Sequence, residues 1–177
     1  ILIRDTKIKG ASCIYYRGQQ LIDIAALYDY SGNEEHAFTF LRQQMAYVNK
    51  IGLNLEYQNA LDVSVFLPQQ TRSVYYVIDS PHTSPDIFTA MLKDMWIKAE
   101  YLCNDYYFTK SNNWGGFAAS GVYNVIAHFP ELAVTEEWLQ RTKEQYTYLL
   151  DKFTFDDGMC LEHPLNYTVT LLGTVES

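Results

Sequence analysis

Apolar residues recur along most of the chain at the three- and four-residue spacing that places them on one face of a helix. Residues 17–30 form the first such segment, and residues 34–51 form the second after a break at Gly32. Asn33 is a favourable N-cap for the second segment, and Gly52 is its expected C-terminal stop. The beginning of the chain therefore predicts two consecutive helices.

The pattern is mixed between residues 59 and 79. Pro68 lacks a backbone donor and obstructs the preceding turn, so we expect a short helix, a break at Pro68 and a second helix. The β-branched and aromatic residues of 73–78 leave a strand as the alternative for that part. Ser84 and Pro85 form a start signal for a helix that extends to about residue 106.

The last part of the chain continues the helical pattern. Residues 108–116 read as a polar loop that ends in glycines, and residues 117–129 read as a helix rich in small residues. Thr135 is the expected N-cap of the next helix, which ends before a turn at residues 156–158. A final helical stretch is expected to begin at Pro164.

Helices of this length with short connections predict an all-α fold of paired antiparallel helices. No low-complexity linker divides the 177 residues, so we expect a single domain over residues 1–177. A sequence repeat of fixed period is not apparent, which argues against a regular solenoid. No apolar stretch is long enough to span a membrane, so we expect no membrane partner.

Charge and composition narrow the classes of function. The formal net charge is −8, and the sequence has no run of Lys or Arg that could bind along a phosphate backbone. We therefore expect no nucleic-acid partner. The 15 tyrosines suit a core that opens onto a wet cleft, and they also suit sugar binding through flat, partly polar rings.

The cysteines argue against a disulfide framework and against a zinc site. Cys13, Cys103 and Cys160 are odd in number, widely spaced and without a CxxC pair, so buried free thiols are expected. We accordingly expect neither a metal nor another cofactor. The chain begins at Ile1 rather than Met, and we expect it to be truncated at both ends.

Two polar segments contain the candidate functional residues. The first covers residues 111–116, with the sequence Ser-Asn-Asn-Trp-Gly-Gly, and the second covers residues 157–167, which end in Asn-Tyr. Between them lie a helix end with the sequence His-Phe-Pro-Glu at residues 128–131 and a helix with an early Trp at position 138.

The order and spacing of these motifs resemble the heparinase II/III family of polysaccharide lyases over residues 111–172. The resemblance implies an (α/α) toroid, here an incomplete α/α barrel that lacks the family's C-terminal β-sandwich domain. It implies β-elimination on an acidic polysaccharide of the heparin, heparan sulfate or alginate type. It also implies a secreted or periplasmic protein, with a cytoplasmic location left open.

The resemblance also implies roles for individual residues. Carried over by position, Asn113 neutralises the uronate carboxylate and Tyr167 transfers the proton. Four neighbours are expected to bind substrate, namely Asn112, Trp114, Glu162 and His163. The chain departs from the family pattern at Trp114 and Thr168, where many members have His. A further catalytic His is expected from outside these 177 residues.

Other interpretations remain open at this point. Asn112 and Asn113 are also ordinary residues for a loop or a helix cap, and Tyr167 also suits a core. Asp62 and Arg72 are most simply interpreted as a structural ion pair. A glycoside hydrolase on a similar fold would need two carboxyl groups, for which Asp156, Asp157 and Glu162 are the clustered candidates. A sugar-binding module without catalysis is the third hypothesis.

Overall fold

The computed structural model describes residues 18–49, 60–103 and 112–161. Within these residues the only β pairing is an isolated bridge between Thr154 and Cys160, so the predicted all-α class is confirmed. The helices are α2 (Gln19–Ser31), α3 (Glu34–Tyr47), α4 (Ala60–Val77), α5 (Pro85–Leu102), α7 (Asn113–His128) and α8 (Thr135–Phe153).

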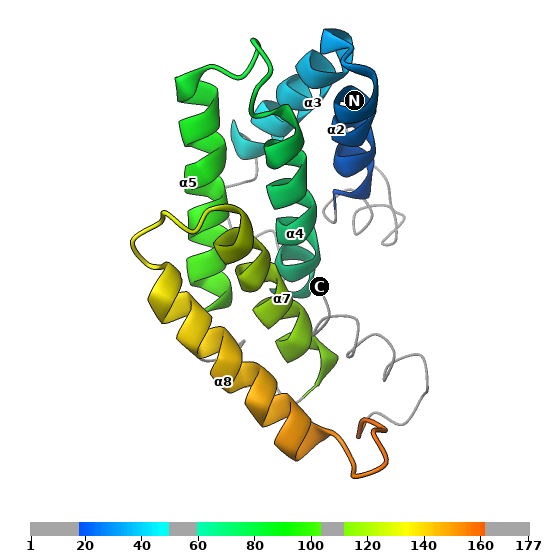
Figure 1. The fold of residues 1–177 in the computed structure, drawn as a ribbon, viewed down its shortest axis with the longest axis vertical. Coiled ribbons are helices and arrows are strands. Elements are labelled where there is room, and N and C mark those ends of the chain that lie inside the picture. Colours follow the sequence, from blue (N-terminus) through cyan, green and yellow to red (C-terminus); the bar gives the residue numbers. More distant parts are fainter. Residues whose placement is uncertain (1–17, 50–59, 104–111, 162–177) are drawn as a thin grey trace.

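The helices form three antiparallel pairs, α2 with α3, α4 with α5, and α7 with α8 (Figure 1). The first helix of each pair packs against the first helix of the next, so that α2, α4 and α7 form an inner row. The second helices, α3, α5 and α8, form an outer row (Figure 1). All inner helices run in the same direction (Figure 1). This two-row arrangement is the predicted incomplete (α/α) toroid.

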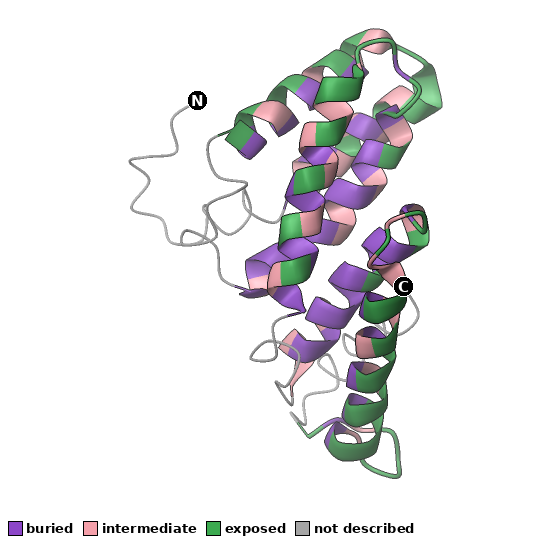
Figure 2. Cartoon of the chain, turned by 90° about the vertical axis from the view of Figure 1, so that its left-hand side faces the viewer, coloured by how far each residue is buried: buried purple, intermediate pink, exposed green. Residues whose placement is uncertain are grey.

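The core lies between the two rows. Buried side chains face one another across the rows, while the outward face of α8 is mostly exposed (Figure 2). The largest fully buried side chains come from both rows, and they include Phe40, Phe66, Leu67, Met91, Met95, Leu102 and Trp138. The apolar stripes predicted from the sequence thus pack against one another rather than facing solvent.

Two of the predicted helix starts are confirmed by their capping geometry. The side chain of Asn33 accepts a hydrogen bond from the Glu35 amide at 3.1 Å, and Ser84 accepts one from the Ile87 amide at 3.3 Å. Both caps satisfy backbone donors that the first helical turn leaves without a partner. Pro85 occupies the first turn of α5, as its fixed φ favours.

The predicted break at Pro68 is wrong. α4 is one continuous helix with Pro68 inside it, which also excludes a strand at residues 73–78. Pro68 cannot donate to the carbonyl of Ser64, so that turn lacks one hydrogen bond. The lost bond is offset by burial on both sides of the proline, for example at Phe66 and Val74.

Other helix ends also differ from expectation. α5 ends at Leu102, earlier than predicted, and the α-helical part of α3 ends at Tyr47. Thr135 is the first residue of α8 and not its cap, because its hydroxyl donates to the carbonyl of Leu132 at 2.9 Å. The helical stretch predicted from Pro164 onwards lies outside the described residues.

A buried ion pair connects α5 to its neighbours. Lys98 Nζ contacts Asp94 Oδ2 and donates to Gln70 Oε1 at 3.1 Å, and both charged side chains are fully buried. The ammonium group also lies 4.8 Å from the ring centre of Tyr47 and 4.5 Å from that of Phe66. Burial lowers the pKa of Lys98 to about 8, although the Asp94 carboxylate opposes this shift. One group thus links α3, α4 and α5.

The cysteines that the structure describes agree with the sequence. Cys103 and Cys160 are buried free thiols, and burial raises the pKa of Cys103 to about 12. Among the helices that the structure describes, none is both long and apolar enough to cross a membrane.

Candidate functional site

The start of α7 contains the first candidate segment, Asn112 to Trp114. It lies on the side of the two rows from which the inner helices start and where α8 ends (Figure 1). We call this side the site end. The opposite end holds the short turns within each pair.

Asn112 and Asn113 differ in what their side chains do. Asn112 is the N-cap of α7, and its side-chain oxygen accepts a hydrogen bond from the Trp114 amide at 3.0 Å. Asn113 is the first helical residue and is half-buried, and within the described part of the chain no hydrogen bond engages its amide group. The structure thus assigns the capping role to Asn112 and leaves the donors of Asn113 available.

The helix begins four residues earlier than the sequence predicted. Gly115 and Gly116 were expected in a loop, but both are buried in the first turn of α7. The Gly115 amide is bonded to the Asn112 carbonyl at 3.0 Å. Asn113 therefore sits on a helical turn with a fixed backbone, which holds a side chain more firmly than a loop does.

Trp114 is half-buried in the same turn. Trp114 directly follows Asn113 in the sequence. That its ring stacks on a sugar remains a prediction. The same is true of the predicted contact between Asn112 and substrate.

The chain returns to the site end after α8. Residues 154–161 form a tight turn in which the Phe155 amide is bonded to the Met159 carbonyl at 2.8 Å. Gly158 has a φ of 86°, which suits the left-handed position of this turn. Cys160 packs with Leu149 and Phe153 at the end of α8, so the last described residues lie beside this helix end.

The remaining candidates, Glu162, His163 and Tyr167, lie outside the described residues. Leu161 is the last described residue, and its amide is bonded to the Phe153 carbonyl at 2.9 Å. Tyr167 is the sixth residue after Leu161, and an extended segment of that length reaches about 20 Å.

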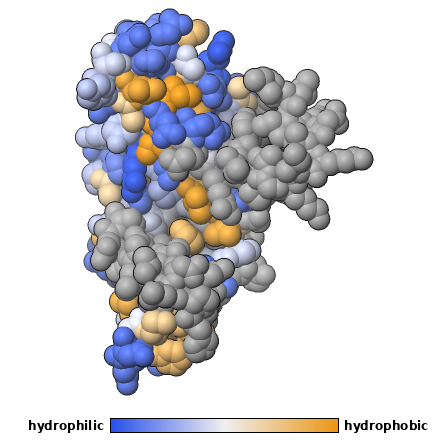
Figure 3. Space-filling model, turned by 90° about the vertical axis from the view of Figure 1, so that its right-hand side faces the viewer, coloured by the Kyte–Doolittle hydropathy of each residue, from blue (hydrophilic) through white to orange (hydrophobic). Residues whose placement is uncertain are grey.

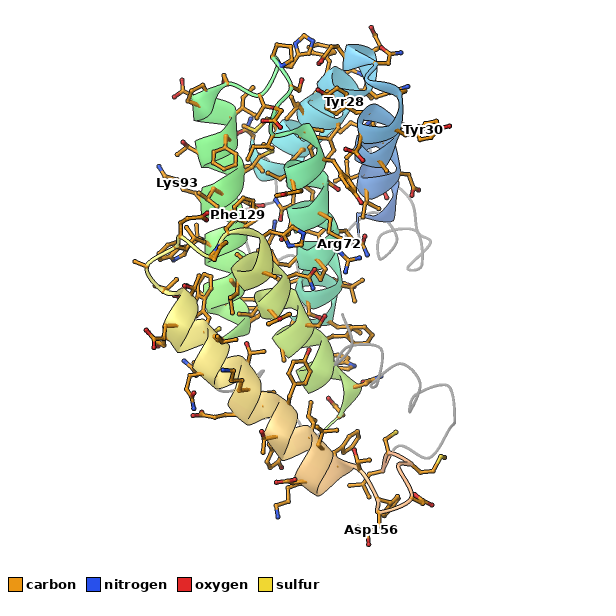
Figure 4. The ribbon with its side chains drawn as sticks, in the orientation of Figure 1. Tyr28, Tyr30, Arg72, Lys93, Phe129 and Asp156 are labelled. Carbon is orange, nitrogen blue, oxygen red and sulfur yellow. The ribbon has the colours of Figure 1, made fainter. Side chains whose placement is uncertain are left out.

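Two of the three carboxylates considered for hydrolysis lie in the described part of the chain. Asp156 and Asp157 are exposed in the turn after α8, and Asp156 projects from its tip (Figure 4). Asp157 accepts a hydrogen bond from the Met159 amide at 3.0 Å, which gives it a role in the turn. Across residues 18–49, 60–103 and 112–161, no cluster of three His, Cys, Asp or Glu side chains suits a metal ion.

One group of side chains was not predicted as a site. No ion pair joins Asp62 to Arg72 in the part of the chain that the structure describes, so the predicted pairing is wrong. Asp62 is buried, whereas Arg72 is half-buried on the opposite side of α4 from α5. Tyr75, one turn further, is 55% exposed and packs edge-on against His128 of α7, with the ring centres 5.4 Å apart.

The fold and the family are both found among known proteins. A crystal structure of heparinase III superposes with a TM-score of 0.79 at 20% identity, covering 90% of this chain and 25% of that one. The heparan sulfate lyase HepC from Pedobacter heparinus superposes with a TM-score of 0.78 at 18% identity, covering 98% of this chain and 32% of that one. The chain thus spans a quarter to a third of these chains.

Sequence comparison gives the family directly. No curated protein matches the chain as a whole sequence. The family model described as Heparinase II/III N-terminus matches residues 15–176. The chain therefore belongs to the heparinase II/III N-terminus family, with the fold of an incomplete (α/α) toroid.

Proposed function

We propose that the protein is a polysaccharide lyase that cleaves a uronic-acid-containing polysaccharide of the heparin, heparan sulfate or alginate type by β-elimination. The observation that carries the proposal is the placement of Asn113. It is a half-buried residue in the first turn of an inner helix, with its amide donors unengaged within the described residues. The family of the chain and the two superposed lyases support the same class of reaction.

Asn113 would act on the uronate carboxylate. The proton to be removed lies on C5, next to that carboxylate, and it is weakly acidic while the carboxylate keeps its full charge. A neutral amide donates a hydrogen bond to the carboxylate without being titrated itself. Such a donor also stabilises the negative charge that develops on the carboxylate as the proton leaves.

The backbone around Asn113 would assist. The positive end of the α7 dipole lies at this turn, and it favours a bound anion. Asn112 fixes the start of the helix by capping it, and thereby holds Asn113 in position. The net charge of −8 gives no general attraction for a polyanion, so binding must depend on local donors of this kind.

Tyr167 would transfer the proton. A phenolate accepts the C5 proton, and the resulting phenol then donates it to the glycosidic oxygen that leaves C4. The C5–H and C4–O bonds break, a C4=C5 double bond forms, and no water is consumed. Glu162, His163 and Trp114 would bind the sugar chain around these two residues, and the family's C-terminal β-sandwich would complete the cleft.

The test is an elimination assay on the protein in its full natural length. Heparin, heparan sulfate, alginate and hyaluronan are each added, and the absorbance of the conjugated C4=C5 double bond is followed. We expect a rise with one polymer. Asn113→Ala and Tyr167→Phe should each lower the rate by at least about 100-fold, in line with the loss of one positioned donor or proton carrier.

The matched control for the tyrosine is Tyr30→Phe, because Tyr30 is 92% exposed on α2 and should leave the rate unchanged. Full activity of Tyr167→Phe would remove that residue from the mechanism. New reducing ends without absorbance would establish hydrolysis in place of elimination. Binding of a polymer without any product would establish a non-catalytic module.

A further inference from the structure

One face of α4 is neither core nor freely exposed. Leu61, Val65, Pro68 and Arg72 follow one another at helical spacing, and all four are half-buried, whereas the flanking positions are mostly buried. In Figure 4 the Arg72 side chain extends away from α5 and the outer row. We call the surface formed by these four residues and Tyr75 the inner face. On this side of the molecule apolar and hydrophilic side chains lie next to one another (Figure 3).

Within the described residues, Arg72 is a cation without a carboxylate partner. No ion pair involves it in the described part of the chain, although the chain has a net charge of −8. Asp62 is buried elsewhere on α4, and Asp23 on neighbouring α2 is exposed and forms no ion pair with Arg72. A guanidinium carries five donors in a planar fork that matches the oxygens of a carboxylate or sulfate. Its donors are therefore available to an external anion.

Tyr75 provides a flat ring beside this cation. It lies three residues after Arg72, so both side chains emerge on adjacent turns of the same helix face. The ring is 55% exposed and is braced by His128, whose ring centre lies 5.4 Å away. His128 is itself held, because its Nδ1 lies 2.8 Å from the Asn124 carbonyl oxygen. A fixed, half-exposed aromatic ring suits the apolar side of a sugar.

We propose that Arg72 and Tyr75 form a subsite for an anionic sugar unit of the polysaccharide. Arg72 binds an oxyanion substituent, and Tyr75 covers the adjoining sugar ring. The identity of the ligand as substrate rests on the proposed lyase function. His128, which contacts Tyr75, lies about 20 Å along α7 from Asn113, since each helical residue advances about 1.5 Å. The subsite is thus remote from the cleaved bond and affects binding rather than chemistry.

The test uses the protein in its full natural length and a heparin oligosaccharide of defined size. Arg72→Gln should weaken binding about tenfold, because it removes a charge-assisted pair of hydrogen bonds. It should raise KM by a similar factor and leave kcat unchanged. Arg72→Lys should restore only part of the affinity, because an ammonium group lacks the planar fork. Tyr75→Ala should weaken binding as well.

The matched control is Arg42→Gln on outer helix α3, which removes the same charge from an exposed position outside the inner face. We expect less than a twofold change, and thermal unfolding should confirm that all variants are folded. Desulfated heparin separates the two oxyanions. If Arg72→Gln still weakens binding of desulfated heparin, Arg72 binds the carboxylate. If Arg72→Gln no longer weakens it, Arg72 binds the sulfate.

The outcomes separate this inference from the lyase proposal. Equal losses in Arg72→Gln and Arg42→Gln, unchanged binding in Arg72→Gln, or no polymer binding by the unmodified protein would each overturn the subsite. Weakened binding in Arg72→Gln together with an absent elimination product would support the subsite while removing the lyase activity. Elimination that proceeds with an unchanged KM in Arg72→Gln would support the lyase activity and overturn the subsite.

Discussion

At the scale of single residues, adjacent asparagines at the start of α7 have separate structural positions. Asn112 caps the helix through its side-chain oxygen, and Asn113 keeps its amide group unengaged in the described structure. A sequence motif of two asparagines does not distinguish these positions, because either residue is a common N-cap. The hydrogen bond to the Trp114 amide makes the distinction.

This distinction gives a prediction for Asn112. Asn112→Ser keeps an oxygen acceptor at the N-cap and should change stability little, whereas Asn112→Ala should cost about 1 kcal/mol. If Asn112 only positions the helix, Asn112→Ser should retain nearly all activity. Thermal unfolding and the elimination assay measure the two effects. A large loss of activity in a fully stable Asn112→Ser variant would show that the amide of Asn112 itself binds substrate.

At the scale of elements, the contact between α4 and α7 is unusually close at one point. Gly121 faces the Ser64 carbonyl, in the turn where Pro68 removes the usual hydrogen-bond donor. A Cβ on Gly121 would lie 3.1 Å from that oxygen and 3.2 Å from Leu102 Cδ1. The backbone donor that Pro68 lacks and the side chain that Gly121 lacks thus both affect the contact at the Ser64 carbonyl.

Gly121→Ala should therefore destabilise the protein. Alanine gains roughly 1 kcal/mol in helix propensity, but overpacking against a helix backbone costs about 1–3 kcal/mol. We expect a small net loss for Gly121→Ala and a loss of several kcal/mol for Gly121→Leu. Ala127→Leu is the control, because Ala127 is exposed on the same helix and has room for a larger side chain. Urea unfolding gives the values, and a more stable Gly121→Ala would show that α4 yields at this point.

The helices show what the sequence predicts and what it does not. Signals that act within one turn were interpreted correctly, as at Asn33 and Ser84, because the cap and its donor are sequence neighbours. Pro68 and the glycines of α7 were misinterpreted, because burial against other helices outweighs local propensity there.

The candidate site was predictable to a similar extent. The segment around Asn113 was found from its resemblance to a family, and the structure places it at the start of an inner helix. The sequence does not predict the contact between Tyr75 and His128 beside Arg72, because these two residues meet only through the packing of α4 on α7. Contacts between residues far apart in sequence have no local signal.

At the scale of the whole molecule, the two ends have different structures. The end opposite the site end is held by direct bonds between its turns. Glu34 accepts hydrogen bonds from Tyr28 at 3.2 Å and from Ser80 at 2.7 Å, and so joins the first helix pair to the second. The site end instead carries the capped start of α7 and the returning chain after α8.

The buried Lys98 group joins the first two helix pairs in the interior, and it gives the last prediction. Its pKa is lowered to about 8 from an ordinary 10.5, so the unfolded chain binds more protons between these two pH values. Stability from this group should therefore rise as pH increases through that window, and it should be lowest below pH 8. Among the described residues, Lys98 contacts the Asp94 carboxylate of α5, the Tyr47 ring of α3, and Gln70 and Phe66 of α4.

The reference for this measurement is Lys98→Met/Asp94→Leu, which carries neither charge and keeps the cavity filled. Urea unfolding at pH 7.5, 9 and 10.5, conditions chosen to bracket about 8 and 10.5, gives the difference in free energy of unfolding between the two proteins. We expect that difference to move in favour of the unmodified protein by a few kcal/mol (roughly 1.4 kcal/mol per pKa unit) as pH rises. The single variant Lys98→Met should be far less stable than either, because it leaves Asp94 buried without its cation. A difference that stays constant with pH would mean that Asp94 holds the Lys98 proton as firmly as water does, and that the ion pair is stable in its charged form throughout.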